Sequence, residues 1–346
     1  MRRQGKPSKS FMNSIFRNLG ASRKDVLVGP GVGLDNAVVS TTMGDVLILT
    51  ADPVSIIPTI ELEASAWMSV HLIASDFATS GVSPQYASFT FNFPPSLGEK
   101  EARRYLSAVG RECGRLGVSI VAGHTGSYPG GGYTVIGGGT MLGFAPRGRY
   151  IDPTMARPGD DVLMTKGVAI EATATLANSF PRFLEERLGR SAVETAKRMT
   201  RDCSTVAESL AASRVGLGDD GVTSMHDATE GGVLGGLAEM AEASRSMFVI
   251  EETRIPVSRI TGGVCGAFGM DPLVSLSEGT LLLTSKITRT GEVAAAIERT
   301  GARAFVIGKV EKGSGLWLAG KRRKRVSPRN DPFWRAYGKA TRMGLS

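Results

Sequence analysis

The chain has 346 residues, of which 42% are hydrophobic and 21% are charged, as in folded proteins that bury a substantial core. No apolar stretch approaches the length of a membrane span, so we expect a cytoplasmic protein that does not enter a membrane. Its three cysteines, Cys113, Cys203 and Cys265, lack metal-ligand spacing, which argues for reduced thiols and against a zinc site.

The net charge of +8 belongs to the two ends of the chain. Residues 1–24 contain seven Lys and Arg and no acid, and residues 321–342 contain nine with only one acid, Asp331. Three interpretations of the basic tail stay open. Its basic residues, interleaved with Phe333, Trp334 and Tyr337, can bind nucleic acid, fold back over the acidic body, or keep the chain soluble.

The length predicts two domains, and the charge pattern adds two arms. We place a basic N-terminal arm with a short helix at 10–19 in residues 1–24, and an N-terminal domain in residues 25–150. A Pro-, Gly- and Arg-rich linker follows. The C-terminal domain then occupies residues 157–320, and the basic tail occupies residues 321–346.

The stretch 29–76 carries three aspartates at the expected ends of structural elements. A glycine-rich bend with Gly31 and Gly33 leads to Asp35, and Asp52 lies just beyond an expected buried strand at 46–50. Apolar residues at spacings of three and four then predict a helix whose last turn contains Asp76.

These three acids predict a site for Mg²⁺ and polyphosphate. An acid near the C-terminus of a helix opposes the helix dipole, so Asp76 is expected to meet a cation. Carboxylate oxygens are the ligands that Mg²⁺ prefers, and glycine allows backbone N–H groups to approach phosphate. The alternative is that each aspartate only caps a turn.

The next segment alternates strictly from Ser88 to Phe93, which predicts a strand with three phenylalanines on one face. A helix is expected at 99–116, and a strand at 118–121 that delivers His124 to an edge of the sheet. Residues 133–145 read as one long strand broken by the glycines 137–139. Long strands with open edges favour pairing across a dimer. His124 either faces phosphate or is a loop histidine bonded to backbone.

The second half opens with an expected strand at 160–165 that ends at Lys166. Further on, Asp227 and Thr229 precede a helix entered through Gly231 and Gly232. The free N–H groups and the dipole of such a helix start favour an anion. Alternatively, Asp227 or Thr229 is only the N-cap of the helix.

The order of these motifs resembles the aminoimidazole ribonucleotide (AIR) synthase superfamily, which has the PurM-like fold, and within it the hydrogenase maturation factor HypE. The resemblance rests on the glycine-rich bend with Asp35, on Asp52, and on five further stretches, at residues 74–84, 122–125, 226–233, 255–257 and 263–279. It covers about residues 29–310. It implies a mixed α/β (α+β) fold of two domains, in which the N-terminal sheets pair across a homodimer and the C-terminal domain is an α/β sandwich.

The resemblance also implies an ATP- and Mg²⁺-dependent enzyme that activates a carbonyl or amide oxygen, or another small acceptor, by phosphorylation. The acceptor, a small molecule or a protein-bound group, is not identified. The positions that match the metal-binding carboxylates of the family are Asp35, Asp52, Asp76 and Asp227. The nucleotide would contact these and Gly31, Gly33, Thr229, Gly231 and Gly232, and the candidates for contact with the transferred phosphoryl group or the substrate are His124 and Lys166.

Two other functions remain open from the sequence. HypE proteins end in a cysteine, whereas no cysteine follows Cys265 here, so the nitrile-forming reaction of HypE is not assigned. Thiamine-phosphate kinase shares the aspartates, which allows a small-molecule kinase. A nonenzymatic alternative is a nucleotide-regulated module that grips nucleic acid with its basic arms.

Overall fold

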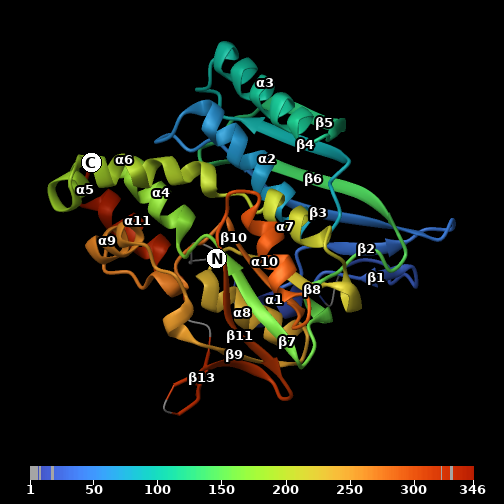
Figure 1. Cartoon of the computed structure of the whole chain (residues 1–346). Coiled ribbons are helices and arrows are strands. Elements are labelled where there is room, and N and C mark those ends of the chain that lie inside the picture. The colour runs from blue at the N-terminus through green and yellow to red at the C-terminus, as the bar shows by residue number, and fades with distance from the viewer. Residues whose placement is uncertain (1–6, 8, 17–18, 321, 328–329) are drawn as a thin grey trace.

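The computed structural model describes residues 7, 9–16, 19–320, 322–327 and 330–346. Two β-sheets, each covered by helices, make up most of the molecule, and further helices gather beside the second sheet (Figure 1). Across the described residues, no helix has both the length and the apolar character needed to cross a bilayer.

The first sheet has six strands, and neighbouring strands are antiparallel except β4 and β5. Helix α3 (Glu99–Arg115) joins that parallel pair, and with α2 (Leu62–Ala78) it packs on the sheet. The helix predicted at 10–19 is present as α1 (Lys9–Ile15) and is shorter than expected, while residues 17 and 18 of that prediction lie outside the described residues. In spatial order the strands are β1 (Val26–Val28), β2 (Ala37–Ser40), β3 (Asp45–Ser55), β6 (Val135–Pro146), β4 (Tyr86–Phe93) and β5 (Ser119–Ser127).

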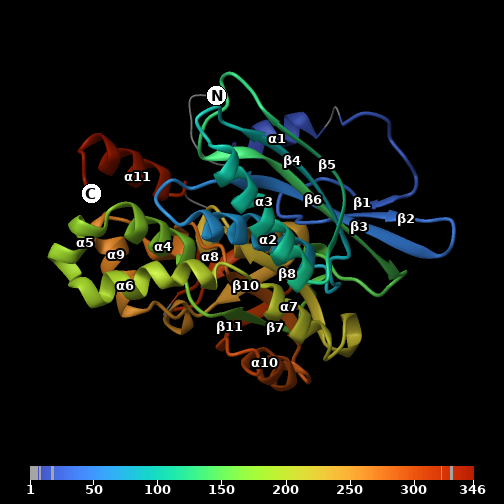
Figure 2. The ribbon, with the colours of Figure 1, turned by 90° about the horizontal axis from the view of Figure 1, so that it is seen from above.

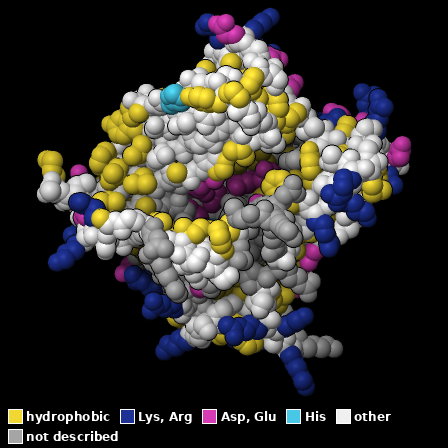
Figure 3. All heavy atoms as spheres, turned by 180° about the vertical axis from the view of Figure 1, so that it is seen from behind, with side chains coloured by type: hydrophobic (Ala, Val, Ile, Leu, Met, Phe, Trp, Pro, Cys, Tyr) yellow, Lys and Arg dark blue, Asp and Glu magenta, His cyan; other side chains and the backbone are white. Residues whose placement is uncertain are grey.

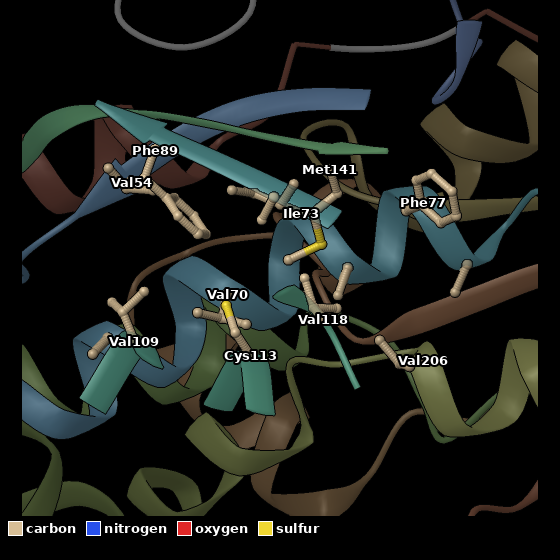
Figure 4. Close-up of a cluster of buried hydrophobic side chains, with 14 of the residues drawn as sticks. Val54, Val70, Ile73, Phe77, Phe89, Val109, Cys113, Val118, Met141 and Val206 are labelled. Carbon is tan, nitrogen blue, oxygen red and sulfur yellow. The ribbon is translucent and has the colours of Figure 1, made fainter. Parts of the chain in front are cut away.

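The core of this unit lies between the sheet and α2 (Figure 4). The alternation along β4 places Phe89, Phe91 and Phe93 on one buried face, as the sequence predicts. They meet Ile73 and Phe77 of α2, which are fully buried in the same cluster. Each such side chain contributes about 1.5–3 kcal/mol by leaving water, so this layer holds α2 against the sheet.

The long strand β6 is uninterrupted, so the expected break at residues 137–139 is wrong. Its three glycines pair with β3 on one side and β4 on the other. A Cβ at Gly139 would lie 2.5 Å from Ile73 Cδ1 and 2.7 Å from Phe89 Cδ1. The glycine therefore serves close packing of α2 and β4 over the strand, and it does not end the strand.

This packing predicts a difference between two adjacent glycines. Gly139→Ala should destabilise the protein by about 1–3 kcal/mol, because the added methyl group overpacks the core. Gly138→Ala is the matched control, since its Cβ would meet only Asp52 O at 3.6 Å. Urea denaturation of both variants measures the difference, and equal midpoints would contradict the packing argument.

The second sheet has seven strands and is covered on both faces. Helix α8 (Gly232–Ala243) packs against one face, and α7 (Val206–Ser213) and α10 (Thr290–Glu298) pack against the other. Alternate residues of its central strands point to each layer, as Met164 and Leu163 do in β7. In spatial order the strands are β13 (Lys324–Val326), β12 (Gly315–Leu318), β9 (Met247–Ile250), β11 (Ala304–Glu311), β7 (Asp160–Thr165), β10 (Thr280–Lys286) and β8 (Val222–Ala228).

A cluster of helices stands beside the second sheet and includes the end of the chain (Figures 1 and 2). Phe333 is buried in this cluster, and Trp334 and Tyr337 pack against it. The aromatic residues of the tail are thus part of the core, as in the fold-back interpretation, and are not presented for stacking on bases. The helices are α4 (Ile170–Ser179), α5 (Pro181–Leu188), α6 (Arg190–Arg198), α9 (Arg259–Ala267) and α11 (Phe333–Arg342).

Helix α2 is the element that joins the two halves (Figure 2). Besides its own sheet it contacts α7 and the edge strand β8. Ser75 Oγ accepts a hydrogen bond from Thr205 N at 2.9 Å, and Trp67 packs with Ile170 and Cys203. The C-terminal end of α2 therefore lies against β8, where the acids predicted from both halves of the chain meet.

Candidate active site

Acidic side chains gather in a hollow at the centre of one face of the molecule (Figure 3). The four predicted aspartates belong to one interacting group, because Asp35, Asp52 and Asp227 all act electrostatically on Asp76. Glu278, which lies just before β10 (Thr280–Lys286), is a fifth member. The structure thus brings together residues that are up to 243 positions apart.

Local hydrogen bonds hold the first three aspartates in place. The Asn36 side chain donates to the carbonyl of Asp76 at 2.7 Å, which fastens the glycine-rich bend to the end of α2. Thr50 Oγ1 donates to the carbonyl of Asp35 at 2.7 Å. Asp52 lies within β3 and not beyond the strand as expected, because pairing with β6 continues to Ser55.

The carboxylates lie close enough to disfavour one another's charge, and the pKa of Asp76 shows this most clearly. Removal from bulk water, together with the negative charges of its carboxylate neighbours, raises the pKa of Asp76 well above the usual 3.8. Like charges in a medium of low dielectric constant repel strongly, and one of them keeps its proton. A bound cation would offset this repulsion and favour the charged form of Asp76.

The edge strand β8 supplies Asp227 and a histidine to which the sequence assigned no role. Asp227 is fully buried, and ligand atoms of Asp35, His226 and Asp227 lie within 4.8 Å of one another. His226 Nδ1 lies 2.7 Å from Asp35 Oδ1, and His226 Nε2 lies 3.0 Å from Glu239 Oε2 on α8.

These contacts make His226 a buried cation. Burial alone would lower its pKa, but the charges and hydrogen bonds of Asp35 and Glu239 outweigh that effect and raise the pKa to about 10. Both ring nitrogens then carry protons and donate to carboxylates. The ring has no lone pair left for a metal, so His226 neutralises and positions Asp35 and does not ligate.

A second group of acids adjoins the first and was not predicted. Glu171 stands in the first turn of α4, where burial and the charges of Asp52, Glu230 and Asp331 raise its pKa to about 8. Asp331 comes from the tail. Glu171 and Asp331 follow no sequence pattern that marks a site, and only the contact between distant segments shows that they adjoin it.

The start of α8 differs from the simple helix cap considered for Asp227 or Thr229. The N-cap position is Gly231, and no side chain of its own caps the helix. Its N–H donates to Asp331 Oδ2 at 2.9 Å. Gly232 is left-handed with φ of 61°, and a Cβ there would lie 2.7 Å from Ser275 O. Thr229 holds the same loop, since its carbonyl accepts from Ser277 N at 3.2 Å.

The glycines of the N-terminal bend have a packing role in addition to the predicted contact with nucleotide. Gly33 has φ of 75°, and a Cβ at this position would lie 2.7 Å from Glu239 Cβ. A Cβ at Gly31 would lie 2.8 Å from Leu34 Cδ1. The bend can therefore reach α8 closely enough for Asp35 to meet His226 only because Gly33 lacks a side chain.

Family models match both halves of the chain. The AIR synthase related protein N-terminal domain matches residues 33–145, and the C-terminal domain of the same family matches residues 157–319. The chain belongs to the AIR synthase-related family. The predicted PurM-like fold of two α/β domains is confirmed.

Several curated relatives are named carbamoyl dehydratase HypE. HypE of Rhizobium leguminosarum bv. viciae is 29% identical over 248 residues, which are 70% of this chain and 67% of that protein. HypE of Escherichia coli K12 is 28% identical over 250 residues, 71% of this chain and 70% of that protein. The matches thus leave about a third of each relative uncovered.

Solved structures share the fold. A HypE–HypF complex superposes with a TM-score of 0.72 at 16% identity, over 92% of this chain and all of HypE. AaThiL with AMPPCP and TMP gives 0.70 at 19% identity, over 95% and 99% of the two chains. HypE in complex with ATP gives 0.65 at 20% identity, over 91% and 90%. These structures show the shared fold, while family membership and the relatives named carbamoyl dehydratase show that the chain is an enzyme of the AIR synthase-related family.

Two predicted residues lie outside the acidic group. His124 is on the outer strand β5, separated from β3 by β4 and β6, and its Nε2 lies 2.6 Å from the hydroxyl of Tyr128. Lys166 forms an ion pair of 2.7 Å with Glu208 and lines a cavity of about 530 Å³ that none of the four aspartates lines. In this structure neither side chain faces the carboxylates.

The donor set of the hollow fits a hard divalent cation. Four aspartates from three elements and a loop converge there, and burial together with their mutual repulsion raises the pKa of Asp76. Mg²⁺ takes carboxylate oxygens and retains waters that phosphates can replace. Asp35, Asp52, Asp76 and Asp227 are the residues that would hold it.

The raised pKa of Asp76 predicts that this residue lowers the stability of the metal-free protein and contributes to Mg²⁺ binding. Because the native carboxyl keeps its proton when the unfolded one has lost it, metal-free stability should fall as pH rises above about 4. Asp76→Asn should remove part of that fall and raise metal-free stability at pH 8 by about 1 kcal/mol. Thermal unfolding in EDTA and in Mg²⁺ provides the measurement, with Mg²⁺ stabilising only the parent protein. If Mg²⁺ stabilises both proteins equally, Asp76 does not bind the ion.

Proposed function

We propose that the acidic hollow binds ATP with Mg²⁺ and that the enzyme transfers the terminal phosphoryl group to an oxygen of an acceptor. The observation that carries the proposal is the meeting of Asp35, Asp52, Asp76 and Asp227 beside the glycine start of α8. The fold shared with a HypE–ATP complex and with AaThiL bound to AMPPCP and TMP supports the choice of nucleotide.

The residues of this chain act mainly by positioning. Phosphoryl transfer depends on alignment of the reactants and on neutralising charge, and bound Mg²⁺ supplies that neutralisation on the phosphate oxygens. Asp52 and Asp76 approach from the N-terminal half and Asp227 from the C-terminal half. Asp35 is held between them by His226. The backbone N–H of Gly231, at the start of α8, would contact phosphate, whereas the N–H of Gly232 donates to the carbonyl of Thr229 at 3.1 Å.

None of the three cysteine thiols of this chain serves as the acceptor. Cys113, Cys203 and Cys265 are all buried. Burial raises the pKa of Cys113 to about 11 and that of Cys265 to about 12, and it raises the pKa of Cys203 well above 9. We therefore favour a small molecule or a group on another protein. Activation of a carbonyl or amide oxygen, as in carbamoyl dehydratases, releases free phosphate, whereas a kinase such as ThiL leaves phosphate on a stable product.

The nucleotide proposal is tested by paired substitutions on β3. Asp52→Asn should weaken Mg–ATP binding by about tenfold or more, because a carboxylate is lost from the ion, and should leave the protein folded. Asp45→Asn makes the same change at an exposed position of the same strand and should have no effect. Calorimetric titration with Mg–ATP measures both. The proposal fails if Asp52→Asn binds Mg–ATP as the parent does.

We also propose a homodimer formed through the first sheet. The edge strand β5 is almost wholly exposed, and it carries Ile120 and Val121 with exposed fractions of 46% and 60%. Nearby apolar side chains are also exposed, among them Val135 and Phe144 of β6. A long, flat, apolar edge is the kind of surface that pairs with a second copy.

Substitution on this edge should separate the subunits. Val121→Glu places a charge in the proposed interface and should shift the protein from dimer to monomer in sedimentation velocity. Met43→Glu is the control, because Met43 is 90% exposed in the turn between β2 and β3, away from β5. A monomeric parent protein, or a dimer that Val121→Glu leaves intact, would contradict the proposed interface.

A further inference from the structure

The tail places a carboxylate on the helix start proposed to receive phosphate. Asp331 Oδ2 accepts the N–H of Gly231 at 2.9 Å, and its Oδ1 accepts the N–H of Phe333 at 2.8 Å. One side chain thus caps both α8 and α11. Since Asp331 is the only acid in residues 321–346, the negative charge of the tail falls at this one position.

A second contact fastens the tail to the same loop. Trp334 Nε1 donates to Glu230 Oε1 at 2.8 Å, next to the residue that Asp331 binds. Phe333 and Ala340 are each 2% exposed in the helical cluster. The last residue is also held, because Phe183 N donates to the carbonyl of Ser346 at 2.7 Å. We call residues 331–346 the strap; it runs as α11 beside α5 and α9 (Figure 1).

The strap reaches the rim of the acidic group. Asp331, Glu230 and Asp52 all act on Glu171, so the strap carboxylate adds negative charge where the site already has an excess. Burial also raises the pKa of Asp331, although the N–H groups of Gly231 and Phe333 oppose that rise. Burial and the charge of Glu230 thus disfavour the ionised form of Asp331 at this position.

We propose that the strap is an autoinhibitory segment whose Asp331 occupies the anion position at the start of α8 and leaves when a phosphate group binds there. A phosphate oxygen and the Asp331 carboxylate require the same N–H of Gly231, so the two exclude each other. The strap-closed form does not accept phosphate at α8, and apparent affinity is reduced by the fraction of molecules in that form. This inference rests on the proposed function and adds its regulation.

Three variants test the strap in the full-length protein. Asp331→Ala removes the competing carboxylate, and Trp334→Phe removes the bond to Glu230 without changing charge. Both should bind Mg–ATP about fivefold more tightly than the parent. Asp152→Ala is the control, because Asp152 caps a different helical turn through Thr154 N at 2.8 Å and lies outside the strap. Calorimetric titration gives the affinities, and circular dichroism shows whether each variant is folded.

Hydrogen exchange of the α11 amides separates displacement from a simple charge effect. In the parent protein, saturating Mg–ATP should speed exchange in residues 333–342 by about fivefold, because the strap is released. If Asp331→Ala binds more tightly but α11 stays protected in the nucleotide complex, charge alone explains the affinity and the strap inference is wrong. Equal affinities for parent, Asp331→Ala and Trp334→Phe also overturn it, while leaving the proposed function standing.

A further outcome separates the two proposals. If neither the parent nor the variants bind Mg–ATP, the proposed function fails. Inorganic triphosphate without metal then decides the strap, because the start of α8 needs only an anion. Tighter binding of triphosphate by Asp331→Ala than by the parent, with faster exchange in α11, upholds the strap. No binding, or binding that the variant does not strengthen, overturns it.

Discussion

The ion pairs of His226 with Asp35 and Glu239 are the contact on which the candidate site depends. They join a bend of the first unit, a strand of the second and helix α8, and they place a positive charge among many negative ones. A buried ion pair adds little net stability, since desolvation offsets attraction, but it fixes which groups face each other. Here it sets the position of Asp35 against Asp227, and with it the relation between the two halves of the hollow.

The hollow is built at the expense of stability. Asp76 and Glu171 both have raised pKa values because neighbouring carboxylates and burial disfavour their charged forms. A cation and the groups it brings remove that repulsion, so binding energy and folding energy are linked at these side chains. The large apolar layers, with Phe77 and Phe89 over the first sheet, supply the stability that such a site requires.

The tail has a structural part in this arrangement. Its strand β13 extends the second sheet, and α11 completes a helical cluster, although residues 322–325 remain exposed. The tail is therefore not a single basic arm that stands apart from the folded protein. Phe333 is in the core with Trp334 and Tyr337 half-buried against it, the arginines and lysines that the structure describes in this segment face solvent, and the single acid meets the start of α8.

The sequence by itself predicted most of the helices and strands, and it singled out Asp35, Asp52, Asp76 and Asp227. Alternation along Phe89, Phe91 and Phe93, the helical spacing before Asp76 and the glycines beside Asp35 are local signals, because strand and helix periods follow from backbone geometry. The tertiary structure alone decided the partners of those aspartates. Glu171, His226 and Asp331 meet them through contacts between distant segments, and a single acid in a helix turn or a tail has no periodicity that reveals its neighbour. It also decided that Gly139 of β6 makes room for Ile73 without ending the strand, since the atoms that a Cβ would strike come from other elements.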